Sequence, residues 1–101
     1  MKSILHDKSD RTCYLCILLD RNEREYSQLH EHHVFYGTSN RKNSEKYGLK
    51  VYLHPEHHNM SKDSVHFNRE YDLLVKREAQ KEFEKAHTRE EFISIFGKNY
   101  L

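Results

Sequence analysis

The fold of this chain is decided by residues 29–58, whose sequence is LHEHHVFYGTSNRKNSEKYGLKVYLHPEHH. Residues 29–36 end in a β-branched and aromatic run that closes at Gly37, a pattern typical of a strand entering a loop. Residues 49–53 predict a second short strand, which ends just before Pro55. We expect the two strands to pair as a hairpin with a long loop over residues 38–46. Pro55 favours the first turn of a helix.

The rest of the chain predicts mainly helix. Residues 1–12 indicate a loosely held arm, and Asp20 begins a turn between two extended or irregular pieces. Apolar side chains recur three and four positions apart over residues 65–86, which predicts one amphipathic helix of about five turns. Thr88 and Glu91 form a capping box, which predicts a short final helix over 89–96. The 101 residues fit a single α+β domain, residues 1–101.

Composition limits the core and names no partner. Charged residues make up 33% of the chain, hydrophobic residues 36%, and the mean hydropathy is −1.03, which leaves little material for an apolar core. The formal net charge of +1 does not by itself indicate nucleic acid. No apolar run approaches the roughly 20 residues that span a bilayer, so we expect no membrane association and a cytoplasmic protein. The oligomeric state is left open.

Two pairs of metal-binding residue types share the same spacing. Cys13 and Cys16 are separated by two residues, and so are His54 and His57. In the cytoplasm the cysteines are not expected to form a structural disulfide, and no thioredoxin-like context surrounds them. Together the pairs supply the four ligands of a closed structural zinc site. The alternative is that both cysteines are packing residues and both histidines lie on the surface.

Histidine is the unusual residue of this composition, with nine in the chain. His32 and His33 are adjacent in the first predicted strand, and His58 directly follows the second zinc-binding pair. Closing the zinc site is therefore expected to bring these three imidazoles together beside the hairpin. Most of the histidines lie in one region, at positions His30, His32, His33, His54, His57, His58 and His66.

These motifs resemble the HNH endonucleases, the ββα-metal nucleases, in their zinc-stapled branch, and more closely small phage-encoded HNH-like proteins. The resemblance covers residues 13–66 and rests on Cys13-x-x-Cys16, on Glu31-His32-His33-Val34, and on residues 53–59, LHPEHHN. Both cysteines of the family's second knuckle are histidines here. The resemblance implies a small zinc-stapled ββα-metal core, a β-hairpin plus a helix, with a C-terminal helix pair over about 67–101 as its buttress.

The resemblance also implies roles for individual residues. His32 and His58 correspond to ligands of a catalytic divalent metal, and His33 corresponds to the general base. The family's middle asparagine matches Asn40, with Asn43 as the other choice. The implied activity is hydrolysis of DNA phosphodiester bonds, in a bacterial host cell if the protein is phage-encoded. A neutral imidazole can accept a proton from water near pH 7, and nitrogen ligands favour Mn²⁺, Ni²⁺ or Co²⁺ over Mg²⁺.

Less specific explanations stay open for parts of this scheme. Strand alternation separates His32 from His33 unless a bulge or strand end redirects one of them, and His58 is then a solvated helix residue. For His66 a further metal ligand, a phosphate contact and a surface residue at the start of a helix all stay open, and His30 is assigned no role. The rival function is a non-catalytic zinc module on the same scaffold that binds DNA or a protein. Four basic residues against one acid could contact the DNA backbone: Arg41, Lys42, Lys46 and Lys50.

Overall fold

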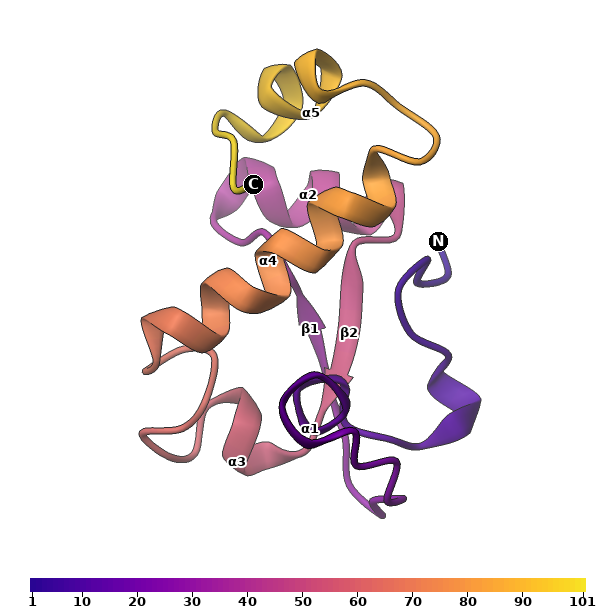
Figure 1. The fold of residues 1–101 in the computed structure, drawn as a ribbon, viewed down its shortest axis with the longest axis vertical. Coiled ribbons are helices and arrows are strands. Elements are labelled where there is room, and N and C mark those ends of the chain that lie inside the picture. The colour runs from indigo at the N-terminus through magenta and orange to yellow at the C-terminus, as the bar shows by residue number, and fades with distance from the viewer.

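The computed structural model describes residues 1–101 and has an α+β architecture built on one hairpin (Figure 1). A two-stranded antiparallel sheet pairs β1 (His30–His33) with β2 (Lys50–Leu53), with His32 opposite Val51. The expected hairpin is confirmed, with strands shorter than the predicted ranges. Five α-helices and a short 3₁₀ helix surround it: η1 (Lys8–Asp10), α1 (Tyr14–Asp20), α2 (Thr38–Tyr47), α3 (Pro55–His58), α4 (Arg69–Phe83) and α5 (Arg89–Phe96).

The connection between the strands is a helix, so the loop predicted over residues 38–46 was wrong. The Ser, Thr and Asn residues of this segment favour loops in general, but here one face of α2 packs on the rest of the fold. Buried Ser44 accepts from the Phe35 amide and donates to its carbonyl, and Tyr47 contacts Phe83. Gly48 ends the helix at a φ of 71°, where a side chain would collide with the Lys2 carbonyl.

Helix α1 corrects a second expectation. Residues 14–20 form a helix rather than an extended or irregular piece. The turn itself lies where it was predicted, because Arg21 ends α1 in the left-handed conformation with a φ of 53°. Leu15 and Cys16 are the buried residues of α1, and the partly buried Leu18 and Leu19 pack against the same core.

The C-terminal helices form the predicted pair. Helix α4, which crosses the hairpin in Figure 1, begins after Asn68, whose side chain accepts from the Tyr71 amide. It is shorter than the predicted 65–86, and residues 65–67 precede it as a connection. Helix α5 spans the predicted range, and Thr88 caps it by accepting from the Glu91 amide.

One apolar cluster joins the hairpin to these helices. Its members are almost completely buried. None of the helices is long and apolar enough to cross a membrane. The cluster packs the hairpin against α1, α4 and α5. The cluster contains Cys13, Leu15, Cys16, Val34, Phe35, Leu49, Val51, Leu53, Val65, Val75, Ala79, Phe83, Phe92 and Phe96.

Candidate metal centres

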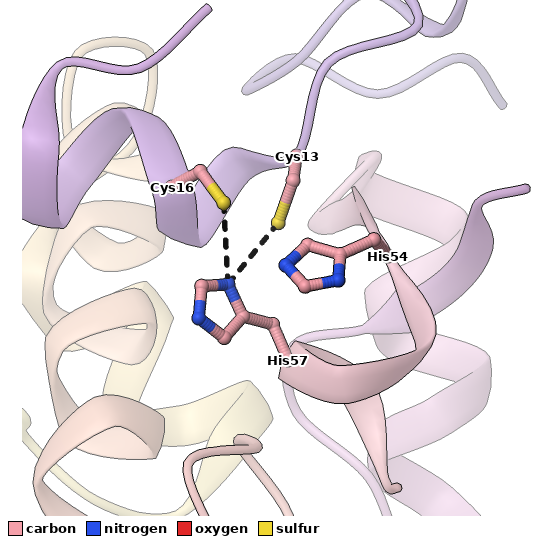
Figure 2. A group of neighbouring side chains, drawn as sticks. All are labelled: Cys13, Cys16, His54 and His57. Carbon is pink, nitrogen blue, oxygen red and sulfur yellow. Dashed lines mark hydrogen bonds between the residues drawn. The ribbon is translucent and has the colours of Figure 1, made fainter. Parts of the chain in front are cut away.

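Two segments distant in the sequence form the first candidate centre, the Cys2His2 site, defined by Cys13, Cys16, His54 and His57. The cysteines come from the start of α1 and the histidines from the start of α3. Figure 2 shows both thiols facing His57, whose Nδ1 lies 3.4 Å from Cys13 Sγ and 3.5 Å from Cys16 Sγ. One ligand atom from each of the four residues lies within 4.8 Å of the others. The four residues predicted as one site could therefore hold a metal ion.

Burial favours the neutral forms of three ligands of the Cys2His2 site: Cys13, His54 and His57. Burial raises the pKa of the Cys13 thiol to about 11, and burial lowers the pKa of both His54 and His57. Neutral imidazoles are the form that metals bind, whereas a thiol must first lose its proton. Tyr26 closes the outer side, with its ring stacked on His54 at 4.5 Å.

The second candidate centre is the histidine cluster, defined by His32, His58 and His66. His32 is 3% exposed and its Nε2 has no hydrogen-bond partner, which is costly for a buried polar atom. The rings of His58 and His66 pack against it at centroid distances of 5.3 and 5.2 Å. His58 Nε2 lies 3.3 Å from His66 Nε2. A nitrogen from each of the three lies within 4.8 Å of the others, so the cluster could also hold a metal ion.

The membership of this cluster corrects the sequence analysis. His32 and His58 meet as expected, but His33 is absent and His66 takes the third position. Neighbouring side chains of a strand point to opposite faces, which separates His33 from His32. The connection before α4 folds back on α3, where the amide of buried Val65 donates to the His57 carbonyl at 2.7 Å. That contact carries His66 to the cluster, and no spacing rule pointed to it.

His30 also has a place that the sequence analysis did not assign. It lies two residues before His32 on the same face of β1, and its Nδ1 is 3.0 Å from His58 Nδ1. A proton on His58 Nδ1, donated to His30, leaves His58 Nε2 with the lone pair that a metal needs. Burial, together with the neighbouring histidines, lowers the pKa of His32 to about 3 and the pKa of His58 to about 4. Both ligands are therefore neutral near pH 7.

His33 belongs to a separate polar group on the other face of the hairpin. Its Nε2 lies 3.0 Å from Glu45 Oε1 and 3.7 Å from Glu31 Oε1. The ammonium of Lys50 lies 3.1 Å from Glu45. The α-amino group of Met1, followed by His33 and Lys50, lowers the pKa of Glu45 to about 2. Glu45 is thus an ionised carboxylate that holds the ring of His33.

Neither asparagine of α2 contacts His33. Asn40 is half-buried in the first turn of α2 and makes no side-chain hydrogen bond. Asn43 donates to the Ile95 carbonyl at 3.4 Å and so links α2 to α5. The residue that positions His33 is therefore Glu45. Glu45 lies in the polar segment 38–46, which was predicted as a loop, and its sequence gave no reason to single out this residue.

The four basic residues do not form one surface. Arg41, Lys42 and Lys46 are exposed on α2, at the end of the hairpin opposite α3 (Figure 1). Lys50 is 7% exposed, and its ammonium is paired with Glu31 and Glu45. Lys50 therefore contributes little free positive charge, and three residues of the set are available for phosphate contacts.

Comparisons of this chain with protein-family models, with curated proteins and with solved structures found no match.

Proposed function

We propose that the Cys2His2 site binds a structural zinc ion. Zinc bound to thiolate at about 2.3 Å and to imidazole at about 2.0 Å, with tetrahedral angles, separates the two ligand atoms by about 3.5 Å. The distances from His57 Nδ1 to the two sulfurs, 3.4 and 3.5 Å, agree with this separation. Two thiolates and two imidazoles are a typical zinc ligand set. The small core gives zinc binding a folding role.

We further propose that the protein is a metal-dependent DNA endonuclease on a ββα-metal core. The observation that carries this proposal is the histidine cluster, with the unpartnered buried Nε2 of His32 between a hairpin and a short helix. Three imidazole ligands would leave positions on an ion open for water and phosphate. A divalent ion bound to His32, His58 and His66 supplies neutralisation of charge on the phosphate and the leaving oxygen.

His33 is the proposed general base. Its Nε2 must carry a proton in order to donate to the Glu45 carboxylate 3.0 Å away, which leaves Nδ1 as the basic nitrogen. Nδ1 can accept a proton from the attacking water, and the carboxylate stabilises the imidazolium that forms. Arg41 and Lys42 hold the DNA backbone along α2.

One observation favours a second candidate, a non-catalytic zinc module that binds DNA or a protein. His33 and the histidine cluster lie on opposite faces of the hairpin, so a base and a metal do not meet across one scissile phosphate without a shift at the end of β1. In that module the Glu31, His33 and Glu45 group is a surface charge network.

Cleavage of supercoiled plasmid DNA with and without Mn²⁺ separates the two candidates. We expect wild-type protein to nick the DNA only with added metal, and His33→Ala to abolish nicking with little effect on folding or DNA affinity. His87→Ala changes a half-buried histidine that belongs to neither centre and packs against Phe83 and Tyr47, and it serves as the matched control for nicking. Absence of nicking with Mn²⁺, Ni²⁺, Co²⁺ and Mg²⁺ in a folded, zinc-loaded protein favours the binding module.

A further inference from the structure

A partly buried lysine of α4 lies beside the histidine cluster. Lys76 donates to Asp72 Oδ2 at 2.8 Å, and each side chain of this pair is 12% exposed. Its Nζ lies 4.5 Å from the centre of the Tyr36 ring. The Tyr36 ring is 5.4 Å from the His66 ring and 5.9 Å from the His32 ring. A single aromatic ring thus separates the ammonium from the histidine cluster.

The Asp72–Lys76 pair leaves polar groups unused. An ammonium has three N–H donors, and Asp72 is the hydrogen-bond acceptor that contacts Lys76. The rings of Tyr36 and Tyr100, at 4.5 and 5.5 Å from Nζ, offer aromatic faces. The other carboxylate oxygen, Asp72 Oδ1, is buried without a donor. A buried ion pair whose polar groups are only partly hydrogen-bonded is a poor source of stability. A contribution to folding stability therefore does not explain why the Asp72–Lys76 pair is present.

The surface between the pair and the cluster is open to a ligand. The Tyr36 side chain that lies between them is 42% exposed, and His66 is also exposed. An oxyanion that reaches this surface can accept hydrogen bonds from Lys76 while another of its oxygens faces the histidines. The chemistry of the surface therefore fits a phosphate group with several oxygens.

We propose that Lys76 is a phosphate-binding residue, which holds a phosphate of the nucleic acid next to the histidine cluster. The proposal rests on the nuclease function proposed above and adds a substrate contact from α4, outside the hairpin and α3. Asp72 is the positioning residue, because its hydrogen bond fixes the ammonium of Lys76 over the ring of Tyr36. A charge-assisted contact of this kind is typically worth about 10- to 100-fold in affinity.

The test compares four variants of the full-length chain. Lys76→Met removes the charge, and Lys76→Arg keeps it. The double variant Asp72→Asn with Lys76→Met removes both charges, so no carboxylate is left unpaired if the single variant fails to fold. Arg77→Met, which neutralises an exposed cation one position further along α4, is the matched control.

The first readout is affinity for a fluorescein-labelled DNA duplex at several salt concentrations, without added divalent metal so that no cleavage occurs. We expect Lys76→Met and the double variant to bind roughly 10-fold more weakly, with the slope of log K against log salt reduced by about 0.9. Lys76→Arg should keep the wild-type slope, and so should Arg77→Met. The second readout is single-turnover nicking with Mn²⁺, which the two charge-removing variants should slow by roughly 10- to 100-fold.

The outcomes distinguish this proposal from the nuclease proposal. A folded double variant with the wild-type salt slope and with nicking within threefold of wild type overturns the role of Lys76, as does a wild-type protein that does not bind DNA. An equal loss in Arg77→Met also overturns it. Wild-type protein that binds DNA but fails to nick it with every metal tested defeats the nuclease proposal. A reduced salt slope in Lys76→Met would then still support the phosphate contact.

Discussion

Removing the ion from the Cys2His2 site should unfold the protein. Structural zinc contributes about 10–16 kcal/mol in small zinc domains, whereas a whole domain is stable by about 5–15 kcal/mol. Here the site joins the start of α1 to α3, a helix of four residues, none of them buried. Helix α3 has no apolar anchor of its own, so its position depends on the site.

The assay is best done in a His66→Ala background. This substitution removes one ligand of the histidine cluster, so that the Cys2His2 site is the complete group of cysteine and histidine ligands that remains. We expect one tightly bound zinc per chain. A strong chelator should abolish the cooperative thermal transition and most of the helical circular dichroism, and added zinc should restore both. Cys16→Ser should lower the thermal midpoint in zinc, whereas Arg77→Met, a change at an exposed residue of α4, should not. Metal-free protein with unchanged circular dichroism and thermal midpoint would show that the fold does not depend on zinc.

Three further predictions concern single features. Glu45→Gln should slow single-turnover nicking roughly 10-fold with unchanged DNA affinity, because the carboxylate fixes the tautomer of the proposed base; equal rates exclude a positioning role. Arg41→Ala with Lys42→Ala should flatten the salt dependence of DNA binding, and an unchanged slope places DNA elsewhere. Burial lowers the pKa of His6, whose Nδ1 accepts from the Tyr52 amide. The free energy of unfolding should therefore be highest above pH 6.5 and should fall below that pH. The fall should be steeper in wild type than in His6→Asn, by at most about 1.4 kcal/mol per pH unit. Equal slopes in the urea denaturation of the two proteins contradict this.

Short, paired spacings allowed much of the site to be predicted from the sequence. A single turn of backbone separates Cys13 from Cys16, and another separates His54 from His57. Within each pair, local backbone geometry therefore directs both side chains to the same point. The hairpin and the final helix, with its Thr88 cap, are likewise governed by local patterns. These are the parts in which sequence neighbours determine structure.

The missing parts depend on long-range packing. Helix α2 is stable because Ser44 and Tyr47 bury against other elements, which a polar sequence does not reveal. His66 reaches the histidine cluster only because α4 begins at residue 69 and leaves the preceding residues free to fold back on α3. His30 could have been placed from strand alternation, since it shares a face with His32.

The histidine cluster is proposed to hold the metal of a nuclease, and the metal preference of single-turnover plasmid nicking decides whether it does. Imidazole nitrogens from His32, His58 and His66 favour later first-row ions over Mg²⁺. Nicking should therefore be faster with Mn²⁺, Ni²⁺ or Co²⁺ than with equal Mg²⁺, and His58→Asn should shift the preference toward Mg²⁺. Full activity with Mg²⁺ alone, together with an unchanged ranking of metals in His58→Asn, would show that the histidine cluster does not hold the catalytic metal.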